Sequence, residues 1–168
     1  MDADRLLDDV SWRLLGELQE HARLTYSELG RRVGLTPPAV AERIRRLEEA
    51  GIITGYRVTL NPEKVGFPLT AFIRISLVDG KCAHFSAVTR ELPEVVECHH
   101  VTGEDDYVLK VVVPSVRHLE AFLERLRPYG ETTTSIVLSS PVTHRVLRPS
   151  PTERSTADEA TGMPSPSV

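Results

Sequence analysis

Two arginines three positions apart, Arg43 and Arg46, are the residues whose type and spacing most directly indicate chemistry in this chain. Residues three apart share one side of a helix, and arginine can donate two parallel hydrogen bonds to a guanine edge or to a phosphate. The smaller Thr36 and Ala39 nearby would allow close approach to base edges. The alternative is a solvated helix face on which Glu42 and other glutamates pair with the arginines.

Two sets of helix start signals flank a glycine turn just before these arginines. Thr25 and Glu28 have the spacing of a capping box, which predicts a helix beginning near Thr25. Gly34 occupies the stop position, after which Thr36 can cap the next helix and Pro37 can take its first position. Two short helices around such a turn form a helix-turn-helix, whose second helix enters the major groove of DNA. The duplicated signals therefore favour a DNA-reading helix over a solvated one.

The apolar residues of the second helix recur at helical spacing and should face a core, namely Val40, Ile44 and Leu47. That periodicity predicts outward positions for the arginines. The candidate DNA-contacting residues are Thr36, Pro37, Ala39, Glu42, Arg43 and Arg46, with Arg31, Arg32, Arg45 and Arg57 as further phosphate candidates.

A third helix and a wing should complete this unit. Asp8 or Asp9 can cap an amphipathic helix that runs through Gln19. After Gly51, a run of β-forming residues broken by Gly55 predicts a short wing or strand. We therefore expect a winged helix-turn-helix DNA-binding domain over residues 1–60, followed by a linker over residues 61–68, where proline and glycine are frequent.

Beyond the linker the apolar period changes from helical to alternating. The predicted strands are 69–78, 95–102, 106–113 and 132–138, and the predicted helices are 84–92 and the segment opened by Pro114 and Ser115. The order βαββαβ is that of a ferredoxin-like domain, here over residues 69–148, so the expected class is α+β. From residue 149 to 168 the Pro, Ser, Thr and Ala content predicts a disordered tail.

The chain resembles the Lrp/AsnC, or feast/famine, transcriptional regulators of bacteria and archaea. The residues that carry the resemblance are Leu7-Asp8, Glu28-Leu29, Val33-Gly34-Leu35-Thr36, the run from Glu42 to Glu48, and Gly51-Ile52-Ile53. The family pattern usually has an aspartate where this chain has Ser11, and often a serine where it has Thr36. The resemblance implies a DNA-binding regulator whose DNA affinity or assembly responds to a bound amino acid.

The loop before the third strand resembles the family's effector-pocket edge, which lies between subunits. By this resemblance Gly103 would leave N–H groups free for an α-carboxylate, and Asp106 would accept from an α-ammonium. The other effector candidates are Glu104, Asp105, Tyr107, Thr132, Thr133 and Thr134. A plain β-turn with a solvated acidic tip is the alternative, and for Glu104 and Asp105 it is the favoured one.

Two further hypotheses concern the effector and the assembly. The carboxylates of Glu97 and of the 104–106 loop suggest a cationic effector side chain, whereas many family members bind aliphatic or aromatic amino acids. One face of the predicted sheet carries Phe72 and Val78 among charged residues, which suggests burial against a second copy. We therefore expect a homodimer, with assemblies up to an octamer allowed.

Composition narrows the remaining function classes. The formal charge of −4 argues weakly against nonspecific nucleic-acid binding, although arginines gather between residues 23 and 47. No stretch is apolar enough to span a membrane and no secretory signal opens the chain, so we expect a cytoplasmic protein. Cys98-His99-His100 looks like a metal cluster, but successive strand residues point to opposite faces, and we expect neither a metal nor a cofactor.

Three alternatives from other classes stay open. The stronger one is an architectural DNA-binding protein with little sequence preference. An enzyme is disfavoured because the chain has no nucleophile-base constellation and no phosphate loop. An amino-acid sensor that acts only on proteins is the third.

Overall fold

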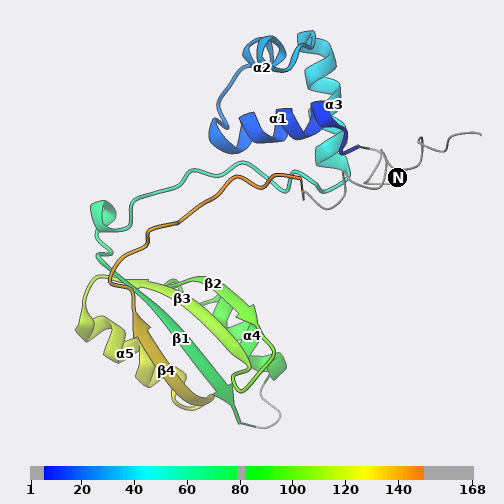
Figure 1. The fold of residues 1–168 in the computed structure, drawn as a ribbon. Helices are drawn as coiled ribbons and strands as arrows, with labels where there is room; N and C mark the ends of the chain where they lie inside the picture. Colours follow the sequence, from blue (N-terminus) through cyan, green and yellow to red (C-terminus); the bar gives the residue numbers. More distant parts are fainter. Residues whose placement is uncertain (1–5, 79–81, 150–168) are drawn as a thin grey trace, which may run out of the picture. The chain divides into compact units, whose positions relative to one another are not determined.

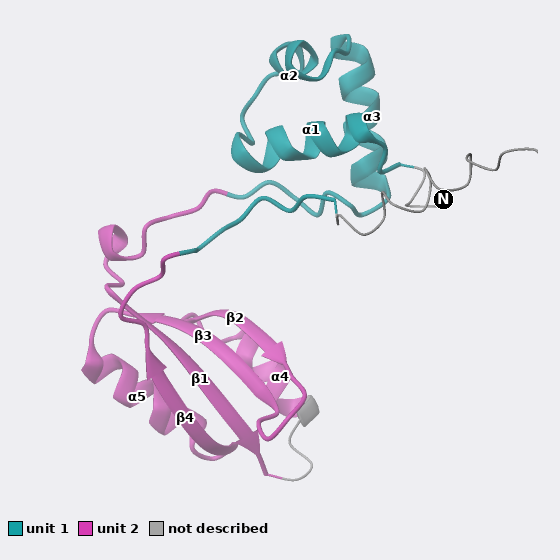
Figure 2. Cartoon of the chain, viewed as in Figure 1, with its two compact units in different colours: residues 1–57, 142–168 teal, residues 58–141 magenta. Residues whose placement is uncertain are grey.

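A computed structural model describes residues 6–78 and 82–149 of the 168-residue chain. They form two compact units, which Figures 1 and 2 draw in the same view. Unit 1 contains residues 1–57 and 142–168, and unit 2 contains residues 58–141. The chain therefore leaves unit 1 after residue 57 and returns to it at residue 142. This division reflects which residues pack together, and it assigns no function to either unit. Of the segment expected to be a disordered tail, residues 150–168 lie outside the described residues.

Unit 1 is built from three helices: α1 (Asp9–Glu20), α2 (Tyr26–Val33) and α3 (Pro37–Glu49). Asp8 caps α1, because its Oδ1 accepts a hydrogen bond from the Ser11 N–H at 2.8 Å. The capping box of α2 is confirmed, with Thr25 and Glu28 each accepting from the other's backbone N–H. The buried apolar residues of the three helices form one core: Leu14, Leu15, Leu18, Leu29, Val33, Val40, Ile44 and Leu47.

The turn between α2 and α3 is as tight as the sequence predicted. Gly34 has φ 77°, a left-handed conformation that favours glycine, and both Gly34 and Leu35 donate their N–H to the Gly30 carbonyl. Thr36 stands at the N-cap position of α3 but makes no capping hydrogen bond through its side chain. The residues that follow it, Pro37 and Pro38, have no N–H to donate.

The predicted wing strand is wrong for the described residues. The segment 51–68 contains no strand, and its only helical turn is the 3-10 turn η2 (Glu63–Val65). Its β-forming residues have no paired strand with which to exchange backbone hydrogen bonds, and a strand exists only in such pairing.

Unit 2 is the predicted βαββαβ arrangement. Its elements are β1 (Leu69–Leu77), α4 (Cys82–Arg90), β2 (Val95–His100), β3 (Tyr107–Val113), α5 (Val116–Leu126) and β4 (Gly130–Ile136). The four strands form an antiparallel sheet in the order β2-β3-β1-β4, in which β1 lies centrally and pairs with both β3 and β4 (Figure 1).

One face of this sheet is covered by the two helices. Its buried strand residues pack with Phe85 of α4 and with Phe122 and Leu126 of α5, and they are Ala71, Ile73, Ile75, Tyr107, Leu109, Val111 and Val113. The alternate residues point to the opposite face, where Phe72 is 41% exposed and no described element of unit 2 covers the strands. The alternation of more buried and more exposed residues that the sequence predicted is confirmed in β1 and β3.

Candidate nucleic-acid interface and effector loop

Helix α3 packs on α1 and α2 through one face and presents the opposite face outward. Val40, Ile44 and Leu47 are buried, as the periodicity predicted. The candidate DNA-contacting residues of this helix divide by exposure. Thr36, Pro37 and Arg46 are exposed, and Ala39, Glu42 and Arg43 are half-buried.

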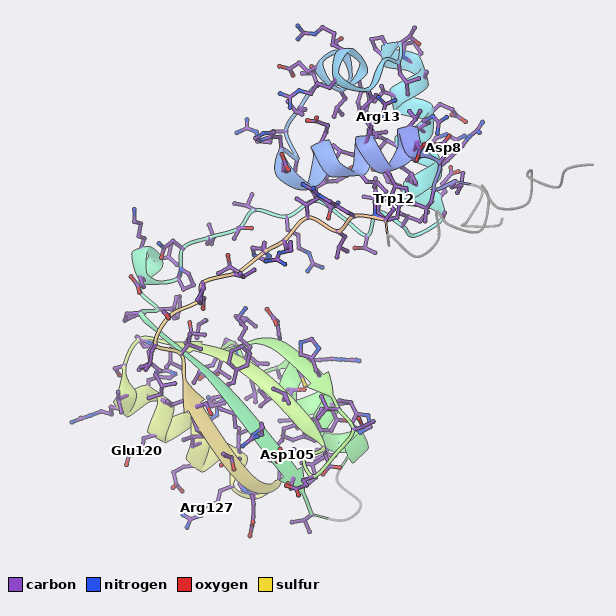
Figure 3. All side chains as sticks on the ribbon, viewed as in Figure 1. Asp8, Trp12, Arg13, Asp105, Glu120 and Arg127 are labelled. Atoms are coloured by element: carbon purple, nitrogen blue, oxygen red, sulfur yellow. The ribbon has the colours of Figure 1, made fainter. Side chains whose placement is uncertain are left out.

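Arg43 does not lie on the outward face, contrary to the prediction. Its Nη1 donates to Asp8 Oδ1 at 2.8 Å and to Ser11 Oγ at 2.8 Å, which ties α3 to the start of α1. Burial raises the pKa of Asp8, but hydrogen bonds from the Ser11 N–H and from Arg43 outweigh it and hold that pKa below its ordinary value of 3.8. Arg43 lies between the core residues Val40 and Ile44 in the sequence, so its side chain borders the buried face of the helix and does not point directly away from it. Figure 3 labels Asp8 at the start of α1.

The outward arginines of α3 are held by glutamates of the same helix. Arg46 Nε donates to Glu42 Oε1 at 2.7 Å. Arg45 binds both oxygens of Glu42, at 2.8 and 3.0 Å, and also pairs with Glu49. The intrahelical pairing that the sequence offered as an alternative is therefore present, on the same face that is free of the core.

The further phosphate candidates differ in their surroundings. Arg32 at the end of α2 pairs with Glu17 of α1 at 2.5 Å. Arg31 and Arg57 are both exposed, and neither forms an ion pair with another residue that the structure describes. These two side chains can contact a phosphate without first breaking an ion pair, unlike Arg32, Arg45 and Arg46.

The loop expected to contact an effector is fastened at its base. The Asp106 N–H donates to the Ile75 carbonyl at 2.9 Å, and the Val101 N–H donates to the Asp106 carbonyl at 3.0 Å. Asp106 Oδ2 accepts from the Leu77 N–H at 2.7 Å, beyond the point where β1 and β3 pair. Gly103 at the exposed tip has φ 124°, where a side chain would be strained. The sequence did not reveal that the Asp106 carboxylate caps β1, because the contact spans 29 positions.

Glu104 and Asp105 contact the open face of the sheet. Ser76 Oγ donates to the Glu104 carbonyl at 3.2 Å and to Asp105 Oδ1 at 3.3 Å. Arg74 Nε lies 3.6 Å from Asp105 Oδ2. Asp105, labelled in Figure 3, is half-buried, whereas Glu104 is exposed.

The remaining effector candidates do not share one surface. In the register of β4 with β1, Thr132 and Thr134 pair with Ile75 and Ile73 on the helix-covered face, whereas Thr133 pairs with Arg74 on the open face. The ring of Tyr107 is in the core, 7% exposed. Only Thr133 of this group therefore lies on the face that the acidic loop contacts.

Three of the acidic side chains in or near the loop, those of Glu97, Asp105 and Asp106, already have partners. Glu97 accepts from Lys110 Nζ at 2.8 Å and lies 3.5 Å from His99 Nε2, while Asp105 and Asp106 are engaged as described. The hydrogen bond from Lys110 lowers the pKa of Glu97 below its ordinary value. The carboxylates of Glu97 and Asp105 thus each lie beside a cation, which reduces the negative charge that this region offers to a cationic effector. Among the described residues, no group of three His, Cys, Asp or Glu side chains is placed to hold a metal ion.

Comparison with known proteins identifies the chain. Residues 7–54 match a winged helix-turn-helix DNA-binding model, and residues 70–147 match the model of the Lrp/AsnC ligand binding domain. An HTH-type transcriptional regulator of Bacillus subtilis is 44% identical over 139 residues, which cover 82% of this chain and 98% of that protein. The chain belongs to the Lrp/AsnC family of transcriptional regulators. Lrp/AsnC proteins are regulators and not enzymes, and the predicted α+β class is that of the family.

Solved structures of other Lrp/AsnC proteins share the fold. A Neisseria meningitidis transcriptional regulator in complex with L-methionine is 35% identical, with a TM-score of 0.79 over 84% of this chain and 96% of that one. The feast or famine regulatory protein of Mycobacterium tuberculosis complexed with L-methionine is 40% identical, with a TM-score of 0.79 over 85% and 99%. In sequence, the chain is also similar to the leucine-responsive regulatory protein of Escherichia coli, which is 38% identical over 79% of this chain and 85% of that protein.

The Lrp/AsnC chain described here is thus a DNA-binding transcriptional regulator with an amino-acid ligand-binding domain. No helix among its described residues is both long and apolar enough to cross a membrane.

Proposed function

We propose that this Lrp/AsnC protein reads a pseudo-palindromic DNA site as a homo-oligomer, and that a bound amino acid changes its DNA affinity or assembly. The observation that carries the proposal is the single-sided packing of α3. Its core face is occupied by the other helices of unit 1, while the side chain of Arg46 on the outward face is 53% exposed. A helix with one free polar face can enter a major groove without disturbing the core.

The proposed DNA contacts combine the outward surface of α3 with cations near it. Arg46 is the base or phosphate reader, with Thr36, Pro37, Ala39 and Glu42 at the groove. Arg31, Arg32 and Arg57 contact phosphates. Arg43 acts by orienting α3 through Asp8, and reaches DNA only if that ion pair opens. In this proposal residues 1–60 bind DNA, residues 61–68 link the two functions, and residues 69–148 bind the effector and oligomerise.

The open face of the sheet is the proposed subunit interface. Phe72 is 41% exposed there, beside half-buried Val108 and Val112. Partly exposed apolar side chains grouped on an otherwise polar face favour burial against a second copy. A two-fold dimer also supplies two α3 helices for the two halves of a pseudo-palindrome.

The proposed effector is an amino acid with an apolar side chain. Two relatives were solved with L-methionine, and a third is named leucine-responsive. The loop from Gly103 to Asp106, with Tyr107 behind it and Thr132, Thr133 and Thr134 on β4, is the proposed contact region. Binding there would shift the arrangement of subunits and hence the spacing of the paired α3 helices.

Two measurements test the proposal. Selection from a random-sequence duplex pool should enrich a pseudo-palindrome, and the selected duplex should bind at least tenfold more tightly than random duplexes. A thermal-shift screen of the twenty amino acids should show stabilisation by methionine or another apolar amino acid. Equal binding of all duplexes would favour the architectural alternative instead, and the absence of stabilisation by any amino acid would remove the sensing role.

A further inference from the structure

The outward surface of α3 carries its own counterion for both of its arginines. Glu42 accepts from Arg46 Nε through Oε1, and from Arg45 through both oxygens. Arg45 is held a second time by Glu49. The four side chains carry two positive and two negative charges, so this surface attracts phosphate much less than the count of arginines suggests.

The carboxylate of Glu42 is ionised throughout the physiological range. Hydrogen bonds from Arg45, and next from Arg46, lower the pKa of Glu42 to about 2. The pairing is therefore not switched by ordinary changes of pH. A competing partner for one of the charges, such as a phosphate, can open it.

Every duplex offers phosphates that can bind the arginines, but only some sequences offer a hydrogen-bond donor that can bind the carboxylate of Glu42. When phosphates bind Arg45 and Arg46 in place of Glu42, the unpaired carboxylate of Glu42 is left near the negatively charged DNA and is repelled by it. On the base edges of the major groove, the donors available to a carboxylate are the amino groups of cytosine and adenine. A site that presents an amino group under Glu42 satisfies the carboxylate while the arginines move to phosphate or guanine, whereas other sites leave it repelled.

We propose that Glu42 is a specificity-determining residue, which withholds Arg45 and Arg46 from noncognate DNA and releases them on sites with a cytosine or adenine amino group in reach. This inference rests on the proposed function, because it requires that α3 be the DNA-reading helix. It makes the intrahelical pairing part of the discrimination between duplexes.

The test compares Glu42→Gln with the matched control Glu48→Gln. Both variants remove one negative charge from α3, but Glu48 accepts from the Tyr56 hydroxyl and binds neither Arg45 nor Arg46. Binding to a random-sequence duplex, and to a duplex selected from a random pool by the unaltered protein, is measured by fluorescence anisotropy across a salt series. Circular dichroism melting verifies that each variant is folded.

Glu42→Gln should bind the random duplex roughly fivefold more tightly, as expected for release of exposed ion pairs. Its plot of log affinity against log salt should steepen by about 0.9 for each arginine that gains a phosphate. The ratio of selected to random affinity should fall, and Glu48→Gln should change none of these beyond a factor of about two.

Two negative results remain distinguishable. If Glu42→Gln leaves random-duplex affinity and salt slope unchanged while the double variant Arg45→Ala/Arg46→Ala loses DNA binding, the role of Glu42 is refuted and α3 remains the reader. If the double variant binds every duplex as the unaltered protein does, α3 is not the reader, and both proposals fall.

Discussion

The side-chain amide of Gln19 holds the backbone of Leu147 at both of its polar groups. Gln19 Oε1 accepts from the Leu147 N–H at 2.9 Å, and Nε2 donates to the Leu147 carbonyl at 3.2 Å. Gln19 lies on α1, and Leu147 lies in the segment that returns to unit 1 at residue 142. The two residues are 128 positions apart, so this contact joins α1 to a segment that follows unit 2 in the sequence.

Gln19→Ala should release the returning segment. The Leu147 N–H loses its acceptor, and hydrogen exchange at that amide should become at least tenfold faster than in the unaltered protein. Global stability should fall by less than about 1 kcal/mol because both groups are exposed and regain water. Glu20→Ala is the control, since it alters the neighbouring exposed position and touches neither hydrogen bond. Unchanged exchange at Leu147 in Gln19→Ala would show that the pair does not hold the segment.

Arg43→Ala should destabilise unit 1 and not only weaken DNA binding. It removes two hydrogen bonds that link α3 to the start of α1, and because Arg43 and Asp8 are 34% and 46% exposed we expect a loss of only about 1 kcal/mol. Chemical denaturation measures it. Arg46→Ala is the matched variant, because its ion pair with Glu42 lies on the exposed surface and its loss should leave stability nearly unchanged while reducing DNA affinity. Equal stability of both variants would contradict an orienting role for Arg43.

The same contact predicts a dependence on pH. The folded-state pKa of Asp8 is lowered from 3.8, so its contribution to stability is fully present above that value and is lost as the pH falls through the lower folded pKa. The stability difference between the unaltered protein and Asp8→Asn should therefore be largest near neutral pH and shrink below pH 3.8. A difference that grew on acidification would reverse the assigned sign.

Local chemistry explains which elements the sequence predicted well. The capping box of Thr25 and the stop at Gly34 depend on residues within one helical turn, and the structure has both. The alternation along β1 and β3 follows from the two faces of a strand and needs no knowledge of partners. These signals were sufficient for the fold class and for the placement of α3.

What the sequence could not supply depends on distant partners. Arg43 was expected outward, but the position of its charge is decided by Asp8, 35 residues away. The end strand was expected over 132–138 and runs over Gly130–Ile136, because its ends are set by the register with β1. The wing strand was expected from composition alone and lacks a paired strand. In each case the outcome depends on whether residues far apart in the sequence contact each other, and no local pattern records this.

Asp106 allows the structural and the effector-binding roles of one carboxylate to be separated. Asp106→Ala leaves the Leu77 N–H without its acceptor and should lower the free energy of unfolding by about 1 kcal/mol. Asp106→Asn keeps an oxygen that can accept from Leu77, and it should restore most of that stability while losing the charge that would bind an α-ammonium. Thermal denaturation of the three proteins measures the first effect.

The effector role is read from the stabilisation that an amino acid confers on the same variants. The probe is L-methionine or, if another of the twenty amino acids stabilises the unaltered protein more, that one. Asp106→Asn should show at most a small part of the shift in Tm seen with the unaltered protein, because the ammonium has lost its ionised partner. A full shift in this variant would assign the carboxylate to the capping of β1 alone.

Phe72 tests the proposed subunit interface on the open face of the sheet. In the register of β1 with β3 it lies opposite Lys110, so Phe72→Arg adds a cation to a face that already carries Lys110 and Arg74. Burying that charge at an interface is costly, and the assembly should dissociate toward monomers in sedimentation velocity at micromolar concentration. Since Phe72 is already 41% exposed in the single chain, the fold itself should persist, as circular dichroism would verify. Val116→Arg, at a 62% exposed position on α5, adds the same charge elsewhere and should leave the sedimentation coefficient unchanged. An unaltered assembly in Phe72→Arg would place the subunit interface on another surface.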